Sequence, residues 1–208
     1  YNEPSASDDP AANPLNEMNP ITWAMIVGES DGETPIVKPN RYDDRNFVRT
    51  SRLSLDAMQG LPWDRPVRLG SIPHWPDDGK ASPRQLSVYT VRRIVDGYTS
   101  NDRKTSILLN YMLGQDYPLE RLPQHVVDAL EATEPGASEK NIVRMTREQR
   151  QIVYDDAKRH SRSLLYHLQN FVHDRATQHA NSFRNFHLSD EFETADKLPP
   201  KPYIREGL

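Results

Sequence analysis

Apolar and small residues recur every three or four positions over one long stretch, and this spacing predicts the longest helix of the chain. The stretch runs from about Thr146 to about Val172, and its stripe consists of Val153, Ala157, Ser161, Leu164 and Leu168. Thr146 and Gln149 match a capping box, in which two side chains satisfy the first free amides of a helix. At 1.5 Å per residue, the helix would be ~40 Å long.

Shorter apolar runs earlier in the chain predict a small sheet and a second helix. Residues 21–28 are rich in β-formers and end at turn residues, which indicates a strand, and Ile36–Val37 is a candidate for its returning partner. Further strands are expected at residues 87–91 and 107–109. A short helix is expected at residues 122–132, because its proline lies in the first turn.

Proline and glycine interrupt the remaining regions. Residues 1–20 have no apolar periodicity and indicate an extended arm. Residues 40–83 carry prolines and glycines too closely spaced for long regular elements. The prediction is an α+β fold with a small sheet, one long helix and extensive loops. Its parts are the arm 1–20, a sheet- and loop-rich region 21–145, the long helix 146–173 and a C-terminal loop 174–208.

The composition indicates a chain that depends on a partner. Its 208 residues are enough to bury a core, but only 36% are hydrophobic, the mean hydropathy is -0.81 and 17 residues are proline. The chain also begins with Tyr1 in place of Met. We therefore expect it to be one processed piece of a longer precursor, unstable and inactive alone.

Charge and cysteine content exclude several classes of function. The net charge of -4 provides no basic field for nucleic acid. Without cysteine there is no disulfide, thiolate metal site or cysteine nucleophile, and a cytoplasmic and a periplasmic location fit equally well. The longest apolar run, Trp23–Val27, is far shorter than the ~20 residues of a membrane span, so none is expected.

Two groups of residues could bind an organic ligand. The first follows an apolar strand in a loop around Gly114, and comprises Asn110, Gln115, Asp116 and Tyr117. Such a loop can present amide, carboxylate and phenol groups to a ligand, or its side chains can cap their own turn. The second is His74–Trp75, which lies between two prolines and is typical either of a substrate pocket or of ordinary packing.

The long helix carries two histidines, a residue type that often binds metal ions. His160 and His167 lie seven residues apart and so share one helix face. No third ligand falls at helical spacing with both, so no metal site is predicted and a polar flank of the helix is the simpler interpretation. No GxGxxG, P-loop or GxSxG sequence occurs, so the chain cannot hold an adenine dinucleotide in the usual way.

Several short motifs in a fixed order resemble the middle region of the large FAD-dependent oxidoreductases. They are Glu3-Pro4-Ser5-Ala6, Thr22-Trp23, Pro39 to Asp43, Arg92-Arg93, Asn110-Tyr111, Asp116-Tyr117-Pro118, Leu164 to Gln169 and Tyr203-Ile204-Arg205-Glu206-Gly207. In the family, the last segment returns the substrate-side region to the flavin domain. Gln115 departs from the family's usual Asn, and Leu208 stands where an arginine usually follows.

The resemblance implies the substrate-side portion of a Rossmann-type FAD oxidoreductase, which oxidises a small organic substrate by hydride transfer to flavin. FAD would be bound mainly by a partner chain of the same enzyme that carries the dinucleotide-binding unit. The implied roles are catalysis for His160, substrate binding for His74, Trp75, Asn110, Gln115, Asp116 and Tyr117, and cofactor binding for Tyr203 and Arg205. The alternative is a non-enzymatic interaction or scaffold subunit of a multi-chain complex.

Overall fold

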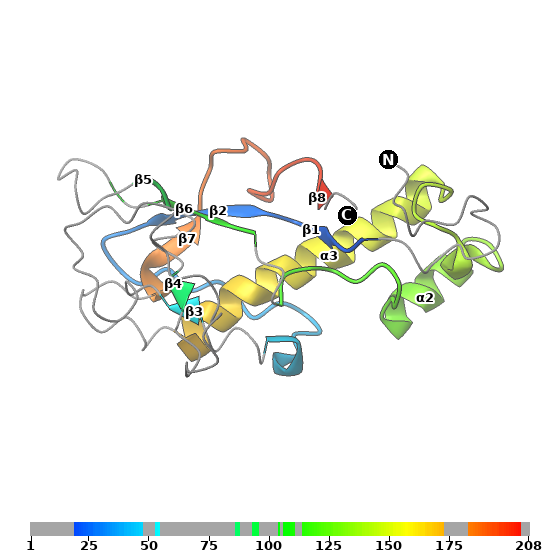
Figure 1. Ribbon diagram of the computed structural model, residues 1–208, viewed down its shortest axis with the longest axis horizontal. Helices are drawn as coiled ribbons and strands as arrows, with labels where there is room; N and C mark the ends of the chain where they lie inside the picture. Colours follow the sequence, from blue (N-terminus) through cyan, green and yellow to red (C-terminus); the bar gives the residue numbers. More distant parts are fainter. Residues whose placement is uncertain are drawn as a thin grey trace, which may run out of the picture.

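A computed structural model describes residues 19–47, 53–54, 86–87, 93–95, 104, 106–110, 114–172 and 183–204. The expected α+β class is confirmed, since helices and small sheets occur together in this part (Figure 1). His74, Trp75 and Arg205, and most of the strand expected at 87–91, lie outside the described residues. No helix in the described ranges is long and apolar enough to cross a membrane.

The largest sheet joins distant parts of the chain in the order β5-β6-β2-β7. Its strands are antiparallel neighbours with the bounds β2 Met25–Glu29, β5 Arg93–Val95, β6 Ser106–Leu109 and β7 Phe186–Leu188. Val27 is opposite Ile107 on one side and Leu188 on the other. The strand expected at 107–109 is therefore confirmed.

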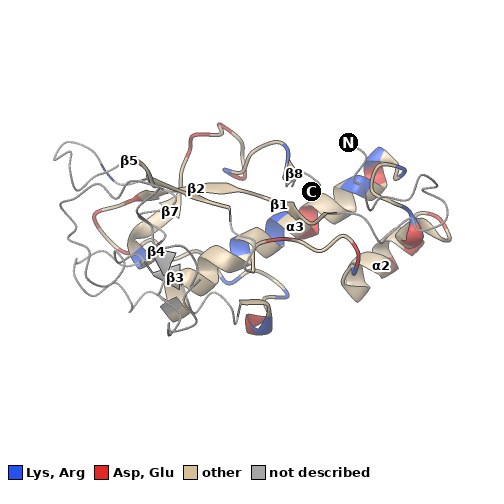
Figure 2. Cartoon of the chain, in the orientation of Figure 1, with Lys and Arg blue, Asp and Glu red and all other residues tan. Residues whose placement is uncertain are grey.

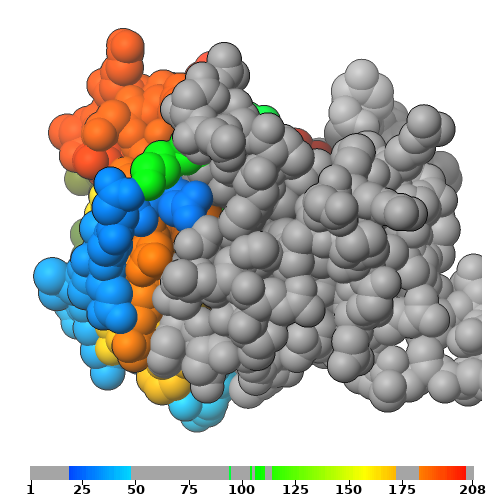
Figure 3. Space-filling model, turned by 90° about the vertical axis from the view of Figure 1, so that its left-hand side faces the viewer, coloured from blue at the N-terminus to red at the C-terminus, as the bar shows by residue number. Residues whose placement is uncertain are grey.

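The return strand expected at Ile36–Val37 is wrong. Both neighbours of β2 are other strands, β6 and β7, and residues 33–39 belong to no strand. The backbone amide of Ile36 instead donates to the side chain of Gln169 at 2.9 Å. The segment after β2 runs alongside residues 183–188, as Figure 3 shows, and the Thr34 amide donates to the carbonyl of Arg184 at 2.8 Å.

The strand expected at residues 21–28 is divided in two. The amide of Ala24 donates to the carbonyl of Thr22 at 3.1 Å, and this tight turn separates β1 (Ile21–Thr22) from β2. β1 pairs antiparallel with β8 (Tyr203–Ile204), so that Ile21 is opposite Ile204. The first and last strands of the described residues therefore lie side by side. A further pair, β3 (Leu53–Ser54) with β4 (Leu86–Ser87), is parallel.

The predicted long helix is confirmed as α3, Arg147–His167, which runs along the length of the molecule (Figure 1). Its capping box is present: the Gln149 amide donates to the Thr146 hydroxyl at 3.2 Å, and the Thr146 amide donates to Gln149 Oε1 at 2.9 Å. The last residues of the predicted helix form a π-helix, η4 (Leu168–Val172). Within η4, the buried Gln169 donates to the carbonyls of Thr34 and Phe186 at 3.0 and 2.8 Å, which attaches the helix to the sheet.

Shorter helices complete the fold. α2 (Gln124–Glu131) packs against α3, and its start after Pro123 agrees with the predicted helix. The 3₁₀ turns η3 (Ala137–Glu139) and η6 (Phe183–Asn185) lie before α3 and before β7. The core contains apolar side chains from β1, β2, β6, α2 and α3, among them Ile21, Val27, Ile107, Leu130 and Leu164.

Candidate functional site

The loop that was predicted to bind substrate lies between β1 and α3. The backbones of Ile21 and Tyr117 bond reciprocally, at 3.2 Å from the amide of Ile21 and at 2.7 Å from the amide of Tyr117. Thr22 also donates its hydroxyl to Asp116 Oδ1. Because β1 also pairs with β8, this loop lies one strand away from Tyr203, which is opposite Thr22.

Gln115 fixes the beginning of this loop from inside the protein. Its side chain is fully buried, and its amide nitrogen donates to the carbonyl of Trp23 at 3.0 Å and to that of Leu109 at 3.2 Å. These bonds join the end of β6 to the turn between β1 and β2. Gly114, just before it, has a φ of 97°, a conformation that a side chain would disfavour. Glycine and glutamine thus set the shape of the loop.

His160 holds the same loop from α3. Its Nε2 donates to the carbonyl oxygen of Gly114 at 2.8 Å, so the neutral ring carries its proton on Nε2. The imidazole is buried and its ring centre lies 5.4 Å from that of Phe47 and 5.9 Å from that of Tyr117. Burial lowers the pKa of His160, so the neutral form is favoured.

A buried carboxylate, Asp156, lies one helical turn before His160 and joins three elements. Its oxygens accept from Tyr117 Oη at 2.9 Å, from His125 Nε2 at 2.8 Å and from Arg159 Nε at 2.6 Å. Burial alone would raise the pKa of Asp156, but the hydrogen bonds from Arg159 and His125 outweigh it and lower the pKa to about 2. The carboxylate is therefore charged at neutral pH and anchors α2 and the loop to α3.

The phenol of Tyr117 is a hydrogen-bond donor and not a proton source. Burial, and then the negative charge of Asp156, raise the pKa of Tyr117 far above its usual range. Its hydroxyl is already committed to Asp156. The polar side-chain atoms of Gln115 and Tyr117 therefore form hydrogen bonds within the protein. This agrees with the alternative in which the loop side chains stabilise the loop itself.

Asn110 differs from the other loop residues because part of its side chain has no partner. It follows β6 directly and is buried, yet its Oδ1 accepts no hydrogen bond within the described part of the chain. A buried amide oxygen without a donor is costly, and native proteins contain only a few such groups. Of the predicted substrate-binding residues that the structure describes, Asn110 offers the open acceptor.

The structure brings Gln115, Asp116, Tyr117 and His160 together around one loop, and places Tyr203 on the neighbouring strand. Sequence reasoning missed Asp156, His125 and Arg159. A signal existed for two of them: Asp156 precedes Arg159 by three residues and His160 by four, so all three lie near one side of a helix. In the described ranges no group of three or more His, Asp or Glu side chains could hold a metal ion.

Comparison with known proteins identifies no relative. The sequence matches no protein-family model, and neither a curated protein nor a solved structure is significantly similar to it.

Proposed function

We propose that this chain is the substrate-side part of an FAD-dependent oxidoreductase, in which another polypeptide holds most of the flavin and an organic substrate is oxidised by hydride transfer to it. The proposal rests on the sequence motifs, and the pairing of β1 with β8 supports it most directly. A region inserted between two parts of a flavin domain must leave and return at one place. β1 and β8 meet that requirement, because they form one two-stranded sheet.

The described residues do not fit an adenine dinucleotide by themselves. A dinucleotide pyrophosphate is usually held by the free amides of a helix that follows a glycine-rich turn. The first turn of α3 is already capped by Thr146 and Gln149, and α2 begins directly after Pro123. The proposed flavin therefore belongs to a companion chain, and this chain would supply walls of the substrate cavity.

Within that cavity the residues would divide into two kinds. Asn110 would accept a hydrogen bond from the substrate, since its Oδ1 is open. His160 would act as a neutral donor that holds the loop, because its Nε2 already contacts Gly114. Gln115, Asp116 and Tyr117 would be positioning residues, since their side chains hydrogen-bond to other groups of the protein.

One observation favours a scaffold subunit as the second candidate. The polar side chains of Gln115, Tyr117 and Asp156 all bond one another or the backbone, as they would in a purely structural network. Ile204 is also exposed on β8, where a partner chain could dock without any reaction.

The test is to purify the chain together with the polypeptides that remain bound and to record the visible flavin absorbance. We expect a flavin band in the complex that follows the companion chain when the two are separated. Ile204→Asp should weaken the complex and reduce its flavin content, because β8 leads to the proposed junction. Val143→Asp is the matched control, since Val143 is also an exposed apolar residue and lies before α3, far along the chain from β8.

The second measurement separates the enzyme from the scaffold. His160→Ala and Asn110→Ala complexes should keep their flavin but lose rate in flavin reduction by a panel of organic substrates. A colourless complex with a stable companion would support the scaffold subunit and end the enzyme proposal.

A further inference from the structure

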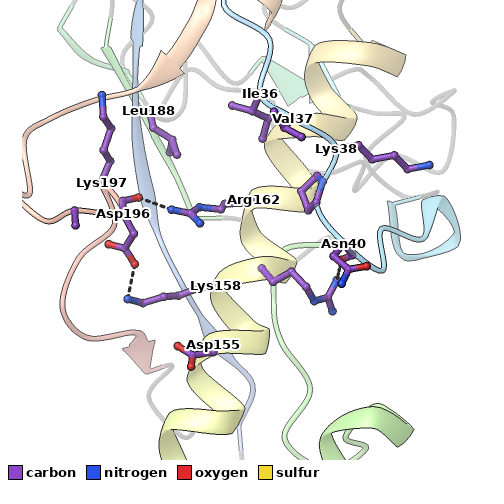
Figure 4. Close-up of a pocket in the computed structure, with 13 residues that line it drawn as sticks. Ile36, Val37, Lys38, Asn40, Asp155, Lys158, Arg162, Leu188, Asp196 and Lys197 are labelled. Carbon is purple, nitrogen blue, oxygen red and sulfur yellow. Dashed lines mark hydrogen bonds and ion pairs between the residues drawn. The ribbon is translucent and has the colours of Figure 1, made fainter.

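The outward face of α3 forms the floor of an open groove of about 700 Å³. One wall is the extended segment 36–40, and the other contains residues 195–197 and Leu188, as Figure 4 shows. The volume falls in the range typical of sites for small organic ligands. The groove lies apart from Gln115, Tyr117 and Asn110, none of which lines it.

Positive charge dominates this groove. Its lining includes five cationic side chains, Lys38, Lys158, Arg159, Arg162 and Lys197, and two carboxylates, Asp155 and Asp196. Three of the cations have ion-pair partners: Lys158 pairs with Asp196 at 2.6 Å, Arg159 with Asp156 at 2.6 Å and Lys197 with Asp190 at 2.8 Å. Figure 2 shows basic residues recurring along α3.

Arg162 and Lys38 are the cations of the groove that form no ion pair with a described residue, and Asp155 is the lining carboxylate that forms none. Arg162 donates from Nη2 to the backbone carbonyl of Asp196 at 2.7 Å, a neutral acceptor, and no carboxylate of the described residues forms an ion pair with it. Lys38 lies on the opposite wall, exposed, with its ammonium 5.4 Å from the ring centre of Tyr42, and Figure 4 shows its side chain pointing away from Arg162. A guanidinium has five N–H groups, so Arg162 retains donors for a carboxylate.

An apolar strip adjoins these cations. Ile36, Val37 and Leu188 line the groove, and the Val37 side chain is 89% exposed. Exposed apolar surface next to an unbalanced cation suits a ligand with both an anionic head and an apolar body. An inorganic anion would interact with the cation but would leave the apolar side chains uncovered.

We propose that this groove binds an organic carboxylate with an apolar body, with the carboxylate on Arg162 and the body against Ile36, Val37 and Leu188. The proposal is independent of the flavin proposal, because no residue of the groove belongs to the loop around Gly114.

Calorimetric titration of the chain in the form in which it purifies, with any companion polypeptide retained, tests the site. The probe is octanoate, compared with acetate, octanol and inorganic phosphate. We expect saturable octanoate binding that weakens with added salt and is at least about tenfold tighter than binding of the other three compounds. Arg162→Gln should weaken octanoate binding by about tenfold, the effect of one charge-assisted hydrogen bond.

Arg147→Gln is the matched control, since Arg147 is exposed at the other end of α3, and it should bind octanoate as the unaltered chain does. If Arg162→Gln does not fold by circular dichroism, Arg162→Lys, which keeps the charge but loses the planar guanidinium, and Val37→Asp still test the head and the body separately. Equal octanoate binding by the Arg162 and Arg147 variants would overturn the proposed position. Absence of saturable octanoate binding, or phosphate binding as tight as octanoate binding, would overturn the ligand class.

Discussion

The two faces of α3 carry similar charged side chains but use them in opposite ways. On the inner face, Asp156 is buried and all of its partners, Tyr117, His125 and Arg159, are within hydrogen-bonding distance. On the outer face, Arg162 is half-exposed and its bonded partner is a backbone carbonyl. Burial with complete pairing produces stability and position, whereas exposure with incomplete pairing leaves a charge available to a ligand.

The largest expected loss of stability comes from breaking the hydrogen-bond network around Asp156 on the inner face of α3. Asp156→Asn removes the charge but keeps the size, and it leaves Arg159 and His125 without their carboxylate. Removing one partner of a buried charged network is strongly destabilising, so we expect a loss of about 3 kcal/mol in the free energy of unfolding. Denaturant unfolding measures it.

Asp155→Asn is the control for this change. Asp155 is the neighbouring residue, but it is exposed on the outer face, where it accepts from Gln151. Its substitution should alter the free energy of unfolding by less than about 0.5 kcal/mol. Equal losses from the two variants would show that the faces do not differ.

Lowering the pH should reduce the contribution of Asp156 to the free energy of unfolding. The folded-state pKa of Asp156 is about 2, below its ordinary value of 3.8, so its contribution is complete above about pH 4 and is lost as the pH falls toward 2. The difference corresponds to about 2 kcal/mol. Unfolding measured from pH 6 to pH 2 should therefore show a shallower acid limb for Asp156→Asn than for the unaltered chain. Parallel curves would contradict the assigned role of this carboxylate.

The smallest effect is expected on the outer face. Arg162→Gln loses one half-exposed bond to the carbonyl of Asp196, so the free energy of unfolding should fall by at most about 1 kcal/mol. The melting temperature in the absence of ligand measures this change. A loss as large as that from Asp156→Asn would mean that Arg162 is structural, and that the groove is a by-product of packing.

The sequence predicted the parts of this fold that depend on neighbouring residues. Thr146 and Gln149 lie three positions apart, so their capping box and the helix after it were readable from the chain. The class of fold followed from the same local periodicities. The candidate loop residues were also identified, because Gly114 interrupts a strand-like run.

The features that were missed depend on residues far apart in the chain. Asp156 meets Tyr117 and His125 only after α2, the loop and α3 have packed together. The apolar pair Ile36–Val37 looked like a strand, but Gln169, more than a hundred residues later, takes up the Ile36 amide. Neither contact leaves a periodic signal, since each depends on one long-range polar side chain.

The pairing of β1 with β8 also determines the order in which the protein can be made. Ile21 is synthesised well before its partner Ile204, which emerges only after nearly all of the described chain that follows Ile21. α3, with its local bonds and its own cap, can form while β8 is still missing. The β1–β8 pair is therefore a late step of folding, and until it forms the edge of β1 remains available to another chain.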